Sequence, residues 1–316
     1  MEFNIRRGQN TWRFDPVDRL WTVVTQNRQA QWVPPVAADT LGNNPFVDDD
    51  FALPFLDEAV SGNRRAVALP SPTPSLAIED PPPVFQPFQA EGALGAHELI
   101  VPLLPGVDAR DAAALSAGEL STDSWEAMWT VLRRRLWALS NDRRFHQARV
   151  LFPAQGQRKL QHPHLHLLAL PLPTDTWPKS ACPVCADVQH ARDRGRVVAT
   201  VDDVTAWVPF APKGALHVRI GADAHVGWMQ EDDLSHKDTC SLLRRVTQAV
   251  EGVSGGLDVC VAGAQVPLNS NEGGHFLLDV FVPYDKDAVF RDIGVRVCPT
   301  SPERLAQLLR DWLHEA

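Results

Sequence analysis

The chain has 316 residues, of which 44% are hydrophobic and 22% charged, a composition typical of a soluble globular protein with a substantial core and unlike disordered, collagen-like or fibrous chains. Lys and Arg number 30 against 39 Asp and Glu, and the net charge of -9 disfavours a nucleic acid as the main partner. Apolar runs fall short of the roughly 18 residues of a membrane span and the first residues lack a signal peptide's apolar stretch, so we expect a cytoplasmic protein with no membrane association.

Strand-like runs and helical patterns alternate along the chain. The strand-like runs lie at residues 98–104, 148–152, 164–170, 217–220, 257–262 and 276–282. Apolar spacing predicts helices over residues 125–139 and 238–250, and a third after Ser301 and Pro302, which are a favourable N-cap and first helical residue. The faces that we expect to be buried are Trp125, Met128, Trp129, Leu132, Leu136 and Leu139 in the first helix, Leu242, Leu243, Val246 and Val250 in the second, and Leu305, Leu308, Leu309, Trp312 and Leu313 in the third.

The order of these elements repeats in the two halves of the chain. In each half an apolar strand leads to a long helix, then to a second strand, and then to a histidine-bearing strand that ends in proline. Prolines gather at residues 70–87, which should run extended across a surface, and at 171–178, which resembles a hinge. We therefore predict an α+β protein of two tandem units, residues 1–175 and 176–316, each an antiparallel sheet with a long helix, packed together as an intrachain pseudo-dimer.

Three histidines alternate with apolar residues in the first histidine-bearing strand. His162, His164 and His166 should all point to one face of the strand, while Pro163 and Leu165 point to the other. Such a row can bind a metal, shuttle protons, or supply a nucleophile that is oriented by its neighbours, and a neutral imidazole attacks phosphorus without prior deprotonation. The simplest alternative is a half-exposed strand face without a function.

Two cysteines at close spacing begin the second half. Cys182 and Cys185 have the separation that lets two thiolates bind one zinc ion from a tight turn. A redox dithiol and two unrelated buried thiols are the alternatives. The remaining cysteines, Cys240, Cys260 and Cys298, stand alone, so we expect no disulfide framework.

The sequence His162-Pro163-His164 resembles the galactose-1-phosphate uridylyltransferase family, a branch of the histidine-triad (HIT) superfamily. Looser matches lie at residues 15–24, 95–101, 209–211 and 294–302, so the resemblance spans nearly the whole chain. It implies two HIT-like units and a covalent nucleotidyl intermediate on His164, with His162 and His166 as its partners. It also implies that His225 and His275 complete a structural zinc site with the cysteine pair, the one metal site of the chain.

Several positions depart from the family pattern. His166 replaces the glutamine that is usual in uridylyltransferases and matches the wider superfamily instead. The loop before the row reads Gln157, Arg158 and Lys159, whose cations either clamp a phosphate or are solvated surface charges. Arg28 and Ser71 match substrate-contacting positions. Residues 44–47 lack both thiolates of the family's first-half zinc site, so we expect that site to be empty. The strand of the second half that corresponds to the histidine row keeps only His275, which implies one active site per chain.

The preferred function is a nucleotidyltransferase that moves a nucleoside monophosphate from a nucleotide or nucleotide sugar to a phosphorylated acceptor through His164. A HIT-type hydrolase or phosphorylase of nucleotides or dinucleotides is the nearest alternative, and a non-catalytic nucleotide-binding protein is the third. The expected partners are the nucleotide or nucleotide-sugar substrate and a sugar phosphate or phosphate acceptor, and a homodimer is compatible with the resemblance. Neither a P-loop nor a dinucleotide-binding fingerprint occurs.

Overall fold

The computed structural model describes residues 10–15, 20–24, 44–48, 51–82, 90–158, 160–173, 178–228, 236–269, 274–283 and 296–315. Two of the candidate residues, Arg28 and Lys159, lie outside this part of the chain. None of the helices in the described ranges is long and apolar enough to cross a membrane.

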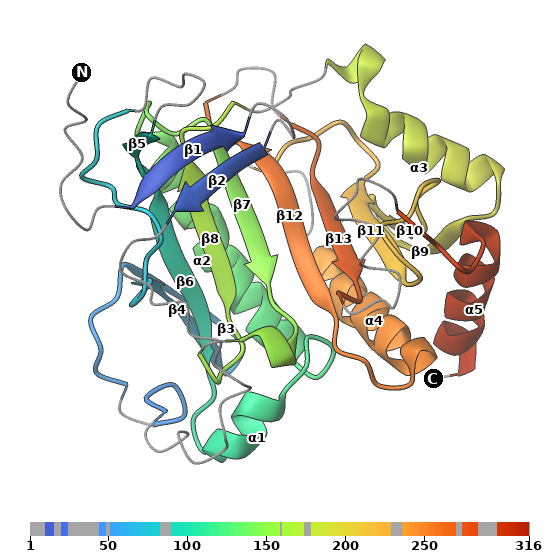
Figure 1. Ribbon diagram of the computed structural model, residues 1–316. Coiled ribbons are helices and arrows are strands. Elements are labelled where there is room, and N and C mark those ends of the chain that lie inside the picture. The colour runs from blue at the N-terminus through green and yellow to red at the C-terminus, as the bar shows by residue number, and fades with distance from the viewer. Residues whose placement is uncertain are drawn as a thin grey trace.

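One antiparallel sheet of ten strands, in the order β3-β4-β6-β8-β7-β12-β13-β11-β10-β9, forms the centre of the molecule (Figure 1). Its strands are β3 (Asp57–Ser61), β4 (Arg64–Pro70), β6 (Ala96–Leu103), β7 (Gln147–Phe152), β8 (Leu165–Leu170), β9 (Val197–Val201), β10 (Val204–Trp207), β11 (His217–Ala222), β12 (Cys260–Pro267) and β13 (Leu277–Phe281). The strand pair β7 and β12 joins the first half of the chain to the second in one continuous sheet. This large antiparallel sheet with helices agrees with the predicted α+β class.

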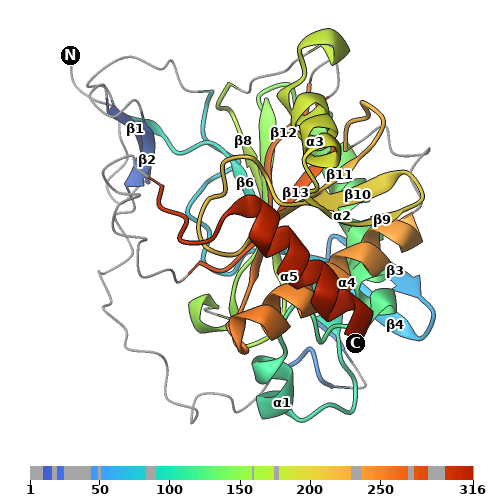
Figure 2. The same cartoon turned by 90° about the vertical axis from the view of Figure 1, so that its right-hand side faces the viewer.

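Two long helices, α2 (Thr122–Ser140) and α4 (His236–Ser254), lie side by side across one face of the sheet (Figures 1 and 2). Every apolar residue predicted for the face of α2 is buried, as are the four predicted for α4. The C-terminal helix α5 (Pro302–Glu315) packs on α4 and β9, and the Ser301 hydroxyl caps it by accepting a hydrogen bond from the Arg304 N–H. The helix periodicity of the sequence therefore predicted this layer correctly.

The opposite face of the sheet carries smaller elements. The helix α3 (Pro183–Asp193) packs there against β9 and β10. Its side of the sheet is shown by β13, where the side chain of Leu277 contacts the α3 cluster while that of its neighbour Leu278 enters the core with α2 and α4. A three-stranded sheet of β1 (Thr11–Asp15), β2 (Leu20–Val24) and β5 (Ala90–Gly92) covers the end of β8 through the buried ring of Trp12. A short helix, α1 (Ala109–Ala114), precedes α2.

Strand boundaries follow the prediction closely except at β12, which was expected over residues 257–262. The strand begins at Cys260 because Gly255 and Gly256 both have positive φ and reverse the chain after α4, and Leu257 then remains 47% exposed. The histidine-bearing strand β8 lies between β6 and β7 in the interior of the sheet. Pro163 is accommodated because it precedes the first paired residue, Leu165.

Candidate active site and metal centre

The histidine row lies on the sheet face opposite α2 and α4. The side chains of Leu165 and Leu167 enter the core with those helices, so that the alternating histidines face the other way. The rings of His164 and His166 meet edge to face with centroids 4.6 Å apart. His162 and His164 are buried and His166 is half-buried, which makes His166 the open end of the row.

A hydrogen-bond chain orients the row. The Nδ1 of His164 lies 2.8 Å from the carbonyl oxygen of His162, so Nδ1 carries the proton and Nε2 carries the lone pair. The Nε2 of His166 lies 3.1 Å from that lone pair and donates to it. The Nδ1 of His166 lies 2.9 Å from the Nε2 of His97, which donates in turn. Neutral imidazoles satisfy every step, and the lone pair of His164 Nε2 is thereby held in a fixed orientation.

His97 was not among the residues proposed from the sequence. It lies on β6, diagonal to His166, since Leu99 is the residue that pairs directly with His166. The stretch 95–101 was recognised as similar to the family, but nothing in its local spacing showed that His97 would reach a histidine 69 residues away. Strand pairing supplies this contact.

Burial keeps His162 and His164 neutral. It lowers the pKa of His162 to about 4, against an opposing hydrogen bond to Pro102. It also lowers the pKa of His164 to about 3, and the charges of the neighbouring His166 and Arg158 contribute in the same direction. At neutral pH the imidazole of His164 is therefore unprotonated.

These shifts predict that the protein loses stability on mild acidification. The unfolded chain protonates both imidazoles near the ordinary value of 6.5, whereas the folded chain does so only near 4 and 3. Between about pH 6.5 and 4 the unfolded state binds more protons, so the free energy of unfolding falls as pH is lowered, by up to about 3 kcal/mol per pH unit. Urea denaturation at several pH values measures this slope, and His164→Asn should remove about half of the histidine contribution. Equal slopes for the two proteins would contradict the assignment.

Asn44, Phe46 and Pro102 fix the ring of His162. The Nε2–H of His162 donates to the Pro102 carbonyl at 2.7 Å, and its Nδ1 accepts from the Asn44 amide at 3.1 Å. The buried ring of Phe46 lies 5.2 Å from the imidazole. The segment that lacks the family's thiolates is thus anchored by packing and hydrogen bonds.

Arg158 is buried, and its charge acts on the row although its contacts lie outside it. It is 5% exposed, with Nε donating to the Pro153 carbonyl at 3.3 Å and Nη1 to the Leu115 carbonyl at 2.7 Å. Burial lowers its pKa to about 10, and its charge in turn depresses the pKa of His164. Arg158 is therefore a cation close to the row and not a solvated surface charge.

The other two described candidates lie on either side of the row. The backbone N–H of Ser71 donates to the His97 carbonyl at 2.9 Å, which places this buried residue next to His97. The Oε1 of Gln157 accepts from the Cys260 thiol at 3.3 Å, so this side chain is tied to β12. The roles of Ser71 and Gln157 toward a substrate stay predictions.

Cys182, Cys185, His225 and His275 converge, with all four candidate donor atoms within 4.8 Å of one another. The Nδ1 of His275 lies 3.4 Å from the sulfur of Cys182 and 3.3 Å from that of Cys185, and the Nδ1 of His225 lies 3.7 Å from Cys185. Tetrahedral coordination at about 2.3 Å for sulfur and 2.0 Å for nitrogen separates such atoms by about 3.5 Å. The four residues could therefore hold a metal ion.

The surroundings of this cluster suit a cation. The Nε2–H of His275 donates to the Ala222 carbonyl at 2.8 Å, which leaves Nδ1 as the lone-pair atom that faces the thiols. Burial and the adjacent Cys182 thiol raise the pKa of Cys185 to about 11, because two neighbouring sulfurs without a cation resist ionisation. A bound metal ion would supply the missing charge.

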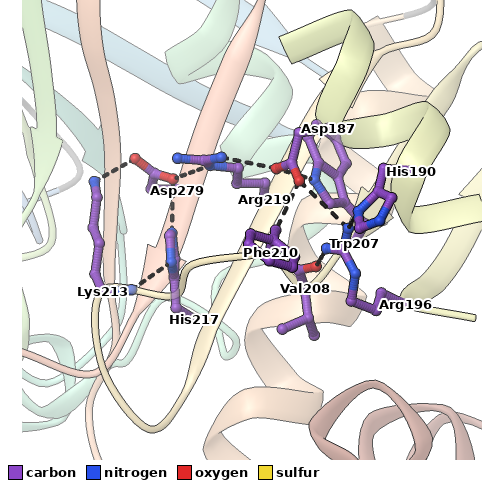
Figure 3. A network of polar contacts seen from close by, with 10 residues as sticks. All are labelled: Asp187, His190, Arg196, Trp207, Val208, Phe210, Lys213, His217, Arg219 and Asp279. Carbon is purple, nitrogen blue, oxygen red and sulfur yellow. Dashed lines mark hydrogen bonds and ion pairs between the residues drawn. The ribbon is translucent and has the colours of Figure 1, made fainter. Parts of the chain in front are cut away.

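The second half carries a charged network on the strand pair of β11 and β13 (Figure 3). Asp279 of β13 pairs with Arg219 of β11, and His217 lies two residues before Arg219. The row shows the same register, since His166 pairs with Leu99 and His97 lies two residues before Leu99. The Nε2–H of His217 donates to Asp279 at 2.7 Å while its Nδ1 accepts the Lys213 backbone N–H at 3.0 Å.

Both ring nitrogens of His217 are thus in use, and Leu277 stands two residues before Asp279, as His164 stands two before His166. Although burial raises the pKa of Asp279, the hydrogen bond from His217 and the nearby cations hold it well below its usual range. Arg219 extends the network to Asp187 of α3, at 2.9 Å (Figure 3). In the described part of the second half, Asp279 and its cationic neighbours thus form an ion-pair network, and this strand pair carries no second row of histidines.

The chain shares its fold with solved uridylyltransferase and ADP-glucose phosphorylase structures. Two uridylyltransferase structures, one of them a mutant, are each 17% identical and match 96% of this chain and 98–99% of theirs, with TM-scores of 0.73 and 0.74. An ADP-glucose phosphorylase from Arabidopsis thaliana with bound ADP-glucose is 15% identical over 96% of this chain and 98% of its own, with a TM-score of 0.67. A galt-like protein from Arabidopsis thaliana is 14% identical over 78% and 83%, with a TM-score of 0.63.

No protein-family model and no curated protein sequence matches the chain. The resemblance to the uridylyltransferase family stated from the sequence is thus confirmed at the level of the fold. At these identities the fold alone is shared, and the chemistry has to be argued from the site.

Proposed function

We propose that the chain is a nucleotidyltransferase in which His164 forms a covalent intermediate with a nucleoside monophosphate. The observation that carries this proposal is the bond from His164 Nδ1–H to the His162 carbonyl, which fixes the tautomer that leaves Nε2 as a lone pair. Burial keeps this nitrogen unprotonated at neutral pH, and Arg158 supplies positive charge near the phosphoryl group.

The first step forms a bond between His164 Nε2 and the α-phosphorus and breaks the bond from that phosphorus to the leaving oxygen. In the free protein the N–H of His166 points to the His164 lone pair at 3.1 Å. When the leaving oxygen replaces that lone pair as acceptor, the nucleophile is released and the N–H of His166 donates a hydrogen bond to the negative charge that develops on the leaving oxygen. His97, which donates to the other nitrogen of His166, favours this tautomer. In the second step a phosphorylated acceptor attacks and the phosphorus–nitrogen bond breaks.

A phosphorylase or hydrolase would use the same intermediate. The histidine at position 166, together with the likeness to an ADP-glucose phosphorylase, supports inorganic phosphate as an acceptor to be tested beside sugar phosphates. Water is the acceptor in the hydrolase version. The donor class in each case is a nucleotide or nucleotide sugar.

The architecture favours two tandem units, residues 1–175 and 176–316, packed as a pseudo-dimer. Five strands from each half meet at the pair of β7 and β12, and α2 and α4 cover equivalent positions. The metal that suits two cysteines and two histidines is zinc, in a closed structural site of the second half. One active site per chain follows, since the counterpart cluster lacks a free imidazole.

Intact-protein mass spectrometry tests the proposal directly. The wild-type chain, incubated with nucleoside diphosphate sugars, nucleoside triphosphates and dinucleotides in turn, should gain the mass of one nucleoside monophosphate with its preferred donor. The adduct should be labile to acid, as a phosphorus–nitrogen bond is, and absent from His164→Asn. If donors are consumed while no adduct forms on the wild type even in rapid-quench samples, the covalent mechanism is wrong.

A further inference from the structure

Arg149 lies on the same face of the sheet as the histidine row. In β7 Leu151 pairs with His166 and Arg149 pairs with Leu168, so Arg149 is the diagonal neighbour of His166 on the side opposite His97. Arg149 and Leu151 alternate with Val150, whose side chain enters the core with α2 and α4. The guanidinium therefore belongs to the histidine face.

No acidic partner accompanies Arg149 in the described part of the chain. Arg135, by contrast, forms a bidentate pair with Glu98, and Arg158 donates to two carbonyls. Arg149 is half-buried without a hydrogen bond or ion pair to a described residue, and this burial lowers its pKa. A desolvated cation without a counter-ion is costly, so an anionic ligand would stabilise it.

The backbone around Arg149 is also irregular. The pairing of β7 with β12 shifts register between Gly263 and Val266, directly opposite Arg149. Such bulges redirect side chains and are frequent beside active sites. Leu151, which is 36% exposed, leaves the face open next to His166.

We propose that Arg149 binds the phosphate group on the leaving side of the reaction, a deepening that rests on the proposed nucleotidyl transfer. His164, His166 and Leu168 follow one another along this face of β8. Arg149 pairs with Leu168, so it lies beyond His166 as seen from His164. A group displaced from phosphorus departs away from His164, toward this end of the row. The acceptor of the second step enters where the leaving group left, so a single phosphate subsite serves both.

The first arm of the test compares leaving groups. A nucleoside diphosphate sugar expels a phosphate-bearing group, whereas a nucleoside 5′-phosphoramidate expels an amine. Arg149→Gln should slow the loading of His164 by the first donor by about 10- to 100-fold, the effect of one lost hydrogen bond to a charged group. Loading by the phosphoramidate should change less than about twofold. Equal slowing with both donors, or with neither, would overturn the proposal.

The second arm measures inorganic phosphate itself. Calorimetric titration of the full-length protein with phosphate should give a dissociation constant at least about tenfold higher for Arg149→Gln than for wild type. The same variant should slow the discharge of loaded enzyme by phosphate. Arg149→Lys should recover part of the affinity, and guanidinium ion should partly rescue Arg149→Ala.

Arg143→Gln is the matched control, because Arg143 is an exposed arginine near the start of β7, outside the row. It should leave both readouts unchanged. Should no donor load the wild type, the nucleotidyl-transfer proposal fails and the phosphate titration alone decides on Arg149. Phosphate binding that is lost in Arg149→Gln then supports the subsite, and equal or absent binding in the wild type overturns it.

Discussion

Replacement of His164 by asparagine should reduce turnover by about 10⁴-fold or more, which corresponds to ~5.5 kcal/mol of transition-state stabilisation. The asparagine amide matches the inner part of the imidazole, so its N–H can keep the bond to the His162 carbonyl, which is 2.8 Å from Nδ1 in the native chain. It deletes Nε2, however, and the amide nitrogen that remains has a delocalised lone pair that attacks phosphorus poorly. The loss should therefore fall on chemistry while the fold is kept.

Steady-state kinetics with the donor identified by mass spectrometry measures this loss, and thermal unfolding verifies that the variant is folded. His146→Asn is the matched control, since His146 is an exposed histidine just before β7 and outside the row. It should retain full activity. Turnover of His164→Asn above about a tenth of the wild-type rate would be incompatible with a nucleophilic role for His164.

Removal of the metal should produce the second large effect, a loss of stability rather than of chemistry. The purified chain should contain close to one zinc ion, bound by the cluster of Cys182, Cys185, His225 and His275. A ligand present at about 1,000 times its dissociation constant stabilises the folded state by about 4 kcal/mol. For a chain of this length, that corresponds to a fall in Tm of about 6 °C on chelation.

Inductively coupled plasma mass spectrometry and differential scanning calorimetry measure the two quantities. Cys182→Ser combined with Cys185→Ser should lose both the zinc and the chelator sensitivity of Tm. Cys298→Ser is the control, because this thiol donates to the Gly214 and Thr300 carbonyls instead of joining the cluster. A wild-type chain that lacks zinc after preparation in zinc-supplemented medium would refute the metal assignment.

The amino-acid sequence by itself determined the features that depend on spacing along the chain. The helices α2, α4 and α5 follow from apolar residues that recur every three to four positions, and their predicted faces are largely buried. The shared face of His164 and His166 follows from the two-residue period of an extended strand. The pair Cys182 and Cys185 was visible for the same reason, and its two histidine partners came only from the family resemblance.

Tertiary structure alone decided the features that depend on which strands pair and in what register. His97 meets His166, Arg149 stands on the other side of β8, and Asn44 takes up the free nitrogen of His162, each through contacts between distant parts of the chain. Local propensity carries no record of strand order, because a strand has the same pattern whichever neighbour it pairs with. The histidine row could therefore be named from the sequence, whereas its hydrogen-bonded partners and the position of Arg149 near His166 emerged only when the sheet was assembled.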